Sequence, residues 1–499
     1  MLTIEEIKTF IDNDGSSTKK KLAETGLRYY EADHDIKNYR VFFVNADGQL
    51  QEDTTKSNFR ISHPFFAELV DQEVQYMLSG KDGFLKSDDP KLQKELDAYF
   101  NDNEDFISEL YEVISGAIIK GFEFAYAYKD KNDRTAFQCA DGMGVVEVRA
   151  KETDDGCEYV IYWYIDRIGK DNKKIKRIQV WNDKETHFFV QEDDGLIEKD
   201  MCFEYKEGKK TNVRPHTIWQ KTGDDKSTYY EGFGFIPFFR LDNNKKQQSG
   251  LKPIKDIIDD YDLMNAGLTN NIQDTNEALY VVKGFQGDNL DELMMNIKAK
   301  KHIGVDEDGG VEIKTIDIPY EARKTKMEID EKNIFRFGMG VNNESLKDTS
   351  ATTSIAIKSA YALLDLKCNK LEIRLKQFMR KLLKVVLKEI NDREGTDYQQ
   401  GDVWFNLERE IITNAQENAQ IELIDAQKQQ VQITTLLNLA NHLDSETLMQ
   451  NICDALDLDY EEIKDKLPKQ DDDGGLAQAQ AALDSIQPED DPDGGGVIE

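Results

Sequence analysis

The sequence predicts an α+β protein that is mainly helical, and three patterns lead to this prediction. From Ile357 to Ile390, apolar residues recur at steps of three and four, which places them on one face of a helix about ten turns long. From Phe122 to Phe239 the spacing changes to two, and short apolar segments alternate with Asp, Asn and Gly turns, as in antiparallel strands. Two further helical segments, 253–275 and 320–337, lie on either side of a short α/β pattern. Helices and an antiparallel sheet in separate parts of one chain are typical of the α+β class.

The length and composition indicate a globular protein of several domains with an acidic surface. The chain has 499 residues, too many for one hydrophobic core, and about two to four domains or subdomains are expected. Hydrophobic residues make up 39% of the chain, which is enough to build packed cores. The formal net charge of −33 repels nucleic-acid phosphates on average, so any contact with DNA must be local.

The cysteine and hydropathy patterns exclude several classes of protein. The five cysteines form no CxxC pair, which argues against a zinc site or a disulfide framework and suits a reducing compartment. The first residues are acidic and amphipathic, unlike a signal peptide, and no run of about 18 apolar residues could span a membrane. We therefore expect the protein to stay in the cytoplasm unless it is assembled into a particle.

Helices and one hairpin are predicted in the first part of the chain. Apolar spacing predicts short helices within residues 1–30 and longer ones within Asn58–Gly80 and Lys91–Gly121. Between them, Tyr39–Val44 alternates like a strand and runs into the turn sequence Asn45–Gly48, which predicts a hairpin.

Two motifs that suggest ligand binding have simpler structural interpretations. Gly232 and Gly234 form a weak match to a phosphate-binding loop, because no helix follows and the third glycine is missing; a tight turn before a strand is predicted. Four aspartates follow Pro253 on a predicted helix, namely Asp256, Asp259, Asp260 and Asp262. They could supply metal ligands, but aspartates so close together on a helix point in different directions. We expect a solvated or subunit-facing acidic surface there instead.

Residues 279–319 are predicted to form a small separate unit: a strand, a helix over 290–301, and two strands joined by a turn at Val305–Gly310. The acidic turn resembles a calcium-binding loop, but its glycine falls one position early and no Glu occupies the twelfth position. A hairpin turn is therefore predicted. A helix over Tyr320–Phe337 then leads back toward the long helix.

Beyond the returning helix, polar and helical stretches alternate. Gly338–Thr353 is rich in Gly, Asn, Ser and Thr, a composition typical of turns, and Ser354 or a nearby Thr is expected to cap the long helix. The sequence VWFNLERE (403–410) predicts a strand, and Thr413–Leu467 predicts helices. Lys469–Glu499 is rich in Asp, Gly and Gln and predicts a disordered tail.

The sequence contains no recognisable catalytic, metal-binding or cofactor-binding motif. A nucleophile elbow, a Walker loop, an HExxH motif and the kinase motifs are all missing. The six histidines are far apart in sequence, and each is expected to be a surface residue or a satisfied core residue. We therefore expect no enzymatic activity, no metal and no cofactor.

Three stretches of the chain resemble the portal proteins of tailed bacteriophages, most closely the type found in siphophages and in prophages of Gram-positive hosts. They are NFRISHPFFAELVDQEVQYMLSG (58–80), the segment 232–284 that begins GFGFIPFFRLDNNKKQQSG, and the polar loop with the long helix at 338–390. The resemblance covers roughly residues 20–450 and depends on the order and spacing of fold elements rather than on a catalytic fingerprint.

The resemblance implies a subunit with named parts and a cyclic assembly. A portal-like subunit has a wing, stem helices, a small α/β clip, a long kinked helix and a helical crown, and its copies form a ring, typically of twelve. In this chain the resemblance implies a wing at 1–249 (helical over 1–121, antiparallel β over 122–240), stem helices at 250–275 and 320–338, and a clip at 276–319. It also implies a tunnel loop at 339–353, a long wing helix with a strand at 354–410, a crown at 411–467 and a disordered acidic tail at 468–499.

The resemblance also implies a function and partners. The ring would occupy one vertex of the capsid in the virion, after assembly in the host cytoplasm, and serve as the channel through which terminase packages double-stranded DNA and through which the DNA is later ejected. Its partners would be further copies of the chain, double-stranded DNA bound without sequence specificity, the terminase large subunit, a head-completion adaptor that leads to tail attachment, and the scaffold and major capsid proteins. No membrane would be involved.

Three groups of site residues follow from this resemblance. The tunnel loop that lines the DNA channel would contain Val341, Asn342, Asn343, Glu344, Ser345, Leu346, Lys347, Asp348, Thr349 and Ser350. The basic residues near phosphates would be Lys324, Lys326, Lys332 and Arg336, each with the alternative of an intersubunit salt bridge to Asp259 or Asp260. The clip residues in contact with terminase or adaptor would be Asp288, Asn289, Lys298, Lys300 and Lys301.

Two other classes of protein remain open as interpretations of the sequence. A metal-dependent nuclease or transferase built from scattered acidic residues would be a compact, low-order oligomer that needs a divalent cation. A monomeric or low-order scaffold or adaptor would bind a basic partner through the acidic tail. A conduit without catalysis is distinguished from both by a closed ring.

Overall fold

The computed structural model describes most of the chain up to Arg409. The described residues are 1–409 except for 46, 55, 81–82, 150–155, 168–173, 194, 205–207, 221–227, 276–278, 286–288, 290–304, 315–318 and 343–353, followed by 427–428, 430–436, 438, 448 and 450–453. The chain divides into two compact units, Met1–Ile411 and Ile412–Glu499, and the described residues of the second unit are helical. The helix predicted at 290–301 and the acidic tail lie outside the described residues.

The N-terminal part is helical and carries one small hairpin, as predicted. Its elements are α1 (Ile4–Gly15), α2 (Thr18–Tyr30), the 3-10 turn η1 (Asp35–Asn38), β1 (Phe42–Val44), β2 (Leu50–Glu52), α3 (Phe65–Met77), β3 (Leu85–Lys86), α4 (Pro90–Leu96), the π-helical turn η2 (Asp97–Asn101) and α5 (Glu104–Lys120). Local sequence signals set several ends. Thr3 and Glu6 form a capping box at the start of α1, and Gly121, with a φ of 93°, ends α5 in the left-handed conformation that glycine adopts without strain.

An antiparallel β region follows, as the alternation predicted. Its strands are β4 (Phe122–Lys129), β5 (Thr135–Ala140), β6 (Val145–Arg149), β7 (Cys157–Arg167), β8 (Lys174–Trp181), β9 (Glu185–Glu192), β10 (Ile197–Lys199), β11 (Phe203–Glu204), β12 (Lys210–Thr211), β13 (Val213–Pro215), β14 (Thr217–Gln220), β15 (Thr228–Glu231) and β16 (Phe238–Asp242). The larger sheet has the order β10-β9-β8-β7-β6 with β13 also paired to β9, and a second sheet has the order β16-β4-β5. Buried residues of α1, such as Ile7, pack on the larger sheet.

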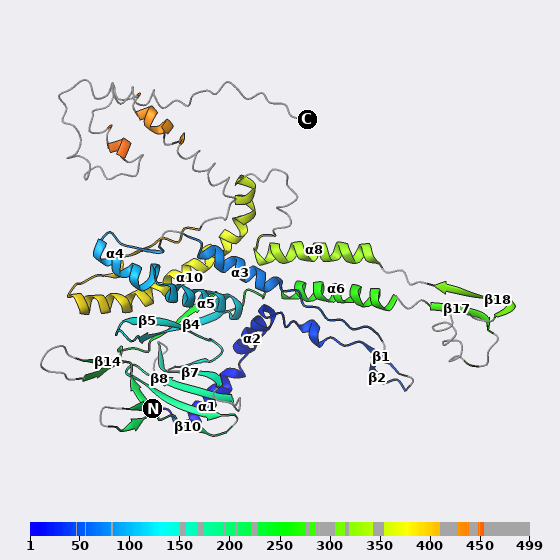
Figure 1. The fold of residues 1–499 in the computed structure, drawn as a ribbon, viewed down its shortest axis with the longest axis horizontal. Coiled ribbons are helices and arrows are strands. Elements are labelled where there is room, and N and C mark those ends of the chain that lie inside the picture. The colour runs from blue at the N-terminus through cyan, green and yellow to red at the C-terminus, as the bar shows by residue number, and fades with distance from the viewer. Residues whose placement is uncertain are drawn as a thin grey trace, which may run out of the picture. The chain divides into compact units, whose positions relative to one another are not determined.

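Two helices leave the body of this unit and return to it. α6 (Lys255–Thr275) and α8 (Tyr320–Gly338) lie side by side and antiparallel, and β17 (Leu279–Phe285) and β18 (Val305–Lys314) pair at their far end (Figure 1). The hairpin turn predicted at Val305–Gly310 is wrong, because these residues belong to the single strand β18. The partner strand β17 supplies hydrogen bonds on both sides of this stretch, and an irregularity between Lys283 and Phe285 accommodates the extra residues.

The long helix α10 (Ser354–Glu394) has 41 residues and passes through the main core. Figure 1 shows that it changes direction along its length. The predicted apolar face is buried from Leu364 to Ile390, where it packs with residues of α3, α5 and the second sheet. After α10 come the 3-10 turn η4 (Gln400–Asp402) and β19 (Trp404–Phe405), so the strand predicted at 403–410 is only two residues long. It pairs with β3, whose own two residues set its length.

Candidate nucleic-acid interface at the root of the helix pair

The chain leaves α8 in close contact with α3. Met339 ends the helix in the left-handed conformation, with a φ of 57°. A Cβ atom at Gly338 would lie 2.6 Å from Leu69 Cδ1, and one at Gly340 would lie 2.1 Å from Leu69 Cδ2. Leu69 is 1% exposed and has little room to move. The two glycines therefore allow the backbone to pass directly over α3.

Gln72 on α3 then holds the chain at the start of the predicted tunnel loop. The Val341 N–H donates to Gln72 Oε1 at 2.9 Å, and Gln72 Nε2 donates to the Val341 carbonyl at 3.0 Å. Asn342 Nδ2 donates to Glu331 Oε1 on α8 at 3.2 Å. Val341 is buried, so the first predicted loop residue serves as an anchor rather than as a lining of an open surface. The other predicted loop residues, 343–350, lie outside the described part of the chain.

The four predicted basic residues on α8 differ in their surroundings. Lys326 is paired with Asp260 on α6 and with Asp330 one turn along α8. Burial of Lys326 alone would lower its pKa, but hydrogen bonds to the two carboxylates outweigh this and raise the pKa. Lys326 therefore pairs with Asp260 within one chain, whereas the alternative stated above was a salt bridge between subunits.

Lys324, Lys332 and Arg336 are exposed on the same helix. Lys332 and Arg336 lie one turn apart and so share a face, and the Arg336 guanidinium lies 5.9 Å from the ring centroid of Phe337. These residues keep their charge available for a partner outside the described part of this chain.

The acidic cluster on α6 is partly paired within the chain, and the expectation of a solvated or subunit-facing surface is wrong only for Asp262. Asp259 Oδ2 accepts from Lys255 Nζ at 2.7 Å, and Asp260 pairs with Lys326. Asp262 has no exposed area, while Asp256 is exposed. Neighbouring positions on a helix point in different directions, so each aspartate meets a different part of the fold.

Asp262 connects two histidines that the sequence did not link. Its carboxylate accepts from His34 Nδ1 at 2.6 Å and from His63 Nδ1 at 2.7 Å, and also from the His63 backbone N–H at 3.1 Å. Burial alone would raise the pKa of Asp262, but the hydrogen bonds from the two histidines prevail and lower it. No spacing signal could have found this group, because its members come from three separate segments.

The predicted clip residues are mostly beyond what the structure describes. Asn289 is exposed, whereas Asp288, Lys298, Lys300 and Lys301 lie outside the described residues. Paired β17 and β18 place this region at the far end of the helix pair from the body (Figure 1).

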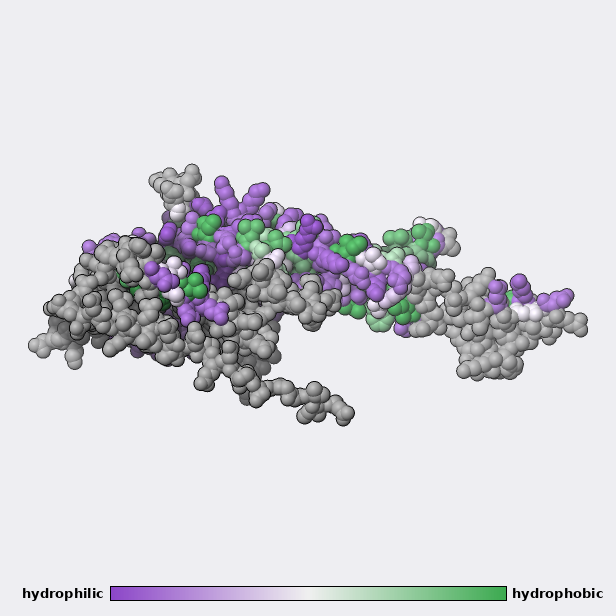
Figure 2. Space-filling model, turned by 90° about the horizontal axis from the view of Figure 1, so that it is seen from above, coloured by the Kyte–Doolittle hydropathy of each residue, from purple (hydrophilic) through white to green (hydrophobic). Residues whose placement is uncertain are grey.

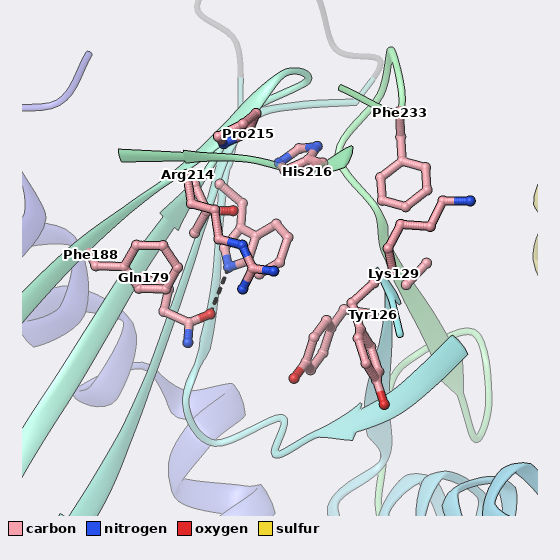
Figure 3. Close-up of a pocket in the computed structure, with 12 residues that line it drawn as sticks. Tyr126, Lys129, Gln179, Phe188, Arg214, Pro215, His216 and Phe233 are labelled. Atoms are coloured by element: carbon pink, nitrogen blue, oxygen red, sulfur yellow. Dashed lines mark hydrogen bonds between the residues drawn. The ribbon is translucent and has the colours of Figure 1, made fainter. Parts of the chain in front are cut away.

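A pocket lies in the β region, away from the helix pair. Aromatic side chains form much of its wall, with His216 near Trp181 and Phe233 at ring-centroid distances of 5.2 and 5.8 Å (Figure 3). Trp181 Nε1 donates to Gln179 Oε1 at 3.1 Å, and Lys129 at the rim is paired with Glu389. Burial lowers the pKa of His216 to about 4, so the ring is neutral at pH 7.

Metal binding and membrane spanning are two further properties of the described residues. Within the described part of the chain, no cluster of three or more His, Cys, Asp or Glu residues has the arrangement to hold a metal ion. None of the helices that the structure describes has the length and apolar character to cross a membrane.

An antiparallel helix pair that carries strands at its far end, and that returns to a polar segment before a long core helix, matches the subunit organisation expected of a viral portal. The family model for phage portal proteins of the SPP1 Gp6-like type matches residues 10–468. The chain belongs to this family of phage portal proteins.

Curated relatives agree with this assignment. The portal protein of Bacillus phage SPP1 is 26% identical over 388 residues, which are 76% of this chain and 73% of that protein. The portal protein of Clostridium phage phiCD119 is 25% identical over 439 residues, which are 84% of this chain and 89% of that protein.

Solved structures also align with the chain, at lower similarity. The neck of a native GTA particle, computed with C12 symmetry, gives a TM-score of 0.38 at 10% identity and covers 78% of this chain and 89% of that chain. The neck of an empty GTA particle, computed with C6 symmetry, gives 0.40 at 11% identity and covers 78% and 90%. The assignment depends on the family model and the curated relatives.

Proposed function

We propose that twelve copies of this chain close into a ring at one vertex of a phage capsid and form the channel for double-stranded DNA. Terminase would package DNA through this channel, and the DNA would later leave through it. The observation that carries the proposal is the helix pair α6–α8, which leaves the body and returns to it at a fixed point where Gln72 holds Val341. In a ring of identical subunits, the polar segment that follows Val341 would begin at the same distance from the ring axis in every copy.

The polar segment fits a channel that contacts DNA without reading its sequence. Asn, Ser and Thr side chains at 342–350 can make weak contacts with a phosphate backbone and carry no base specificity. The net charge of −33 limits strong phosphate binding, which would act as a salt-dependent brake on sliding. Lys332 and Arg336 are exposed cations on the helix that leads to this segment, and we propose them as the residues that approach phosphates.

The other parts of the chain are assigned to the remaining regions of a portal subunit. We propose that 1–249 and 354–410 form the wing, 250–275 and 320–338 the stem, 276–319 the clip, 339–353 the tunnel loop and 411–467 the crown. The clip would meet the terminase large subunit and the head-completion adaptor, and the outer surfaces would meet scaffold and major capsid proteins. The ring would be assembled in the host cytoplasm, would reside in the virion, and would have no catalysis of its own.

The test is the assembly state of the purified full-length protein. Light scattering and negative-stain electron microscopy of one sample should give a particle of about twelve subunits with a central hole. If only monomer is found, the protein is co-expressed with its scaffold and capsid proteins and the particles are imaged for a ring at one vertex. A stable dimer or tetramer without a hole, or capsids without a ring, would overturn the proposal.

A further inference from the structure

Residues 39–61, called the arm here, expose an unusual number of apolar side chains. The arm contains the hairpin β1–β2 and the segment that returns from it to α3. Seven of its apolar residues are between 42% and 69% exposed: Tyr39, Phe42, Phe43, Val44, Leu50, Phe59 and Ile61. A soluble monomer seldom exposes so many apolar residues in one short segment, and such surfaces mark sites of interaction.

The strand register gathers three of these residues on one face of the hairpin. Val44 pairs directly with Leu50, and Phe42 lies two residues before Val44 and so points to the same side. Phe43 and its partner Gln51 lie on the opposite side. A two-stranded hairpin without a core beneath it is at best marginally stable in water, so an apolar face of this kind indicates a partner.

The returning segment of the arm is attached to α6. The Phe59 N–H donates to Asn270 Oδ1 at 2.7 Å, and Asn270 Nδ2 donates to the Phe59 carbonyl at 3.4 Å. The Ser57 N–H donates to Asp274 Oδ1 at 3.1 Å, near the far end of the helix. These contacts attach the returning segment along the outer half of α6, and Figure 1 shows β1 and β2 extending beside this helix.

The charge of the arm favours contact with another copy of the same chain. Copies with a net charge of −33 repel one another, so they meet most readily through surfaces without excess negative charge. The arm has three basic residues and three acidic ones. It is therefore neutral within a strongly acidic protein.

The helix pair also exposes apolar side chains. Ile272 on α6 and Ile329 on α8 are each 50% exposed. Of the α6 residues that follow Asp262 and whose burial the structure describes, only Ala266 is buried. Figure 2 shows hydrophobic atoms at the surface of the helix pair and beside it.

We propose that the arm packs on the α6–α8 helix pair of the neighbouring copy, with Phe42, Val44 and Leu50 covering Ile272 and Ile329. The inference rests on the proposed ring and adds the contact that joins adjacent stems. Each copy gives its arm to one neighbour and receives an arm from the other, which is the head-to-tail contact that closes into a ring. Burial of the apolar face removes it from water and stabilises the assembly.

The first test compares two faces of the same hairpin. The triple variant Phe42→Ser, Val44→Ser, Leu50→Ser removes the proposed contact face, and Phe43→Ser is the control on the opposite face. The triple variant should raise the protein concentration at half assembly by about tenfold or more, whereas the control should change it by less than about twofold. Thermal unfolding of the unassembled subunit should be unchanged in both, because these side chains are exposed in one chain.

The second test locates the partner surface by cross-linking. Leu50→Cys protein is mixed with Ile272→Cys or Ile329→Cys protein, all carrying Cys202→Ser because Cys202 is an exposed native cysteine. After reassembly, a short bismaleimide should join two chains, and Gln51→Cys in place of Leu50→Cys should not. Because the two cysteines lie on different chains, a dimer band reports an intersubunit contact.

The outcomes separate this inference from the proposed ring. Failure of the wild-type protein to form a ring, alone or with its capsid proteins, counts against the ring itself. Rings that form with an unchanged half-assembly concentration in the triple variant, or without a cross-link to either helix, would overturn the inference and leave the ring standing.

Discussion

The carboxylate of Asp262 accepts a hydrogen bond from His34 Nδ1 at 2.6 Å, and neither side chain has any exposed area. The second ring nitrogen, His34 Nε2, lies 3.2 Å from the carbonyl oxygen of Tyr29. The ring of Tyr29 is stacked on that of His34 with centroids 4.4 Å apart. A buried hydrogen bond therefore joins the segment after α2 to the first helix of the pair.

Loss of the Asp262 carboxylate should destabilise the fold. Asp262→Asn replaces one carboxylate oxygen with an amide nitrogen, which cannot accept from a histidine N–H, and this should lower the free energy of unfolding by about 1–3 kcal/mol. Chemical denaturation followed by circular dichroism measures this change. Asp256→Asn, on the exposed side of the same helix, should alter it by less than about 0.5 kcal/mol. Equal effects of the two variants would show that the buried contact contributes nothing.

The same carboxylate gives a pH dependence of known sign. Its folded pKa lies below the ordinary aspartate value of 3.8, so its contribution to stability is present above that value and is lost as the pH falls. Wild-type protein should therefore lose more stability on acidification toward pH 3 than Asp262→Asn does. Denaturation midpoints at a series of pH values test this, and parallel curves for the two proteins would contradict it.

Removal of the Gln72 side chain should loosen the start of the tunnel loop. Gln72→Ala leaves the buried Val341 backbone without its two hydrogen bonds, at a local cost of about 1–2 kcal/mol. The Val341 amide should then exchange with deuterium about tenfold faster. Gln75→Ala, at an exposed position on the same helix, is the matched control. Unchanged exchange at Val341 in Gln72→Ala would mean that the glycine contacts with Leu69 suffice to hold the chain.

Deletion of the predicted tunnel loop should separate assembly from DNA handling. Without Asn342–Thr349, rings of normal mass should form, because the anchoring contacts of Val341 and the core face of α10 are kept. Packaging or retention of DNA in particles should fall, as measured by the DNA content of purified capsids. A Gly/Ser replacement of equal length distinguishes the chemistry of the loop from its length. Loss of rings in the deletion would instead assign the segment to subunit contacts.

His216 should make the β region less stable in mild acid. Burial sets its folded pKa at about 4, below the ordinary value of 6.5, so the unfolded chain takes up a proton first as the pH falls. Stability is complete above pH 6.5 and declines toward pH 4, by up to about 3 kcal/mol from this residue. His216→Phe should flatten the decline, as measured by denaturation at pH 7, 5.5 and 4. A variant with the wild-type pH profile would assign the effect to other groups.

Some parts of the fold could be predicted because their signals are local. The apolar face of α10, buried from Leu364 to Ile390, is set by residues three and four apart, and the alternation after Phe122 specifies strands in the same way. The turn predicted at Val305–Gly310 is wrong because acidic residues and glycines favour turns locally. Pairing with β17 outweighs this local preference, and the stretch forms a strand.

The sequence alone determined the class of the protein: the order of its helices and strands, the two helices that lead out and back, and the resemblance to phage portal proteins, now supported by the match over residues 10–468. Tertiary structure decided which side chains meet. The aspartates of α6 look equivalent in sequence, yet Asp256 faces solvent while Asp262 is buried between His34 and His63. Helical and strand periodicity fixes the direction of a side chain on its own element, but its partner comes from a distant segment that only packing brings near. The same holds for Gln72 and Val341, whose two hydrogen bonds fix where the predicted channel segment begins.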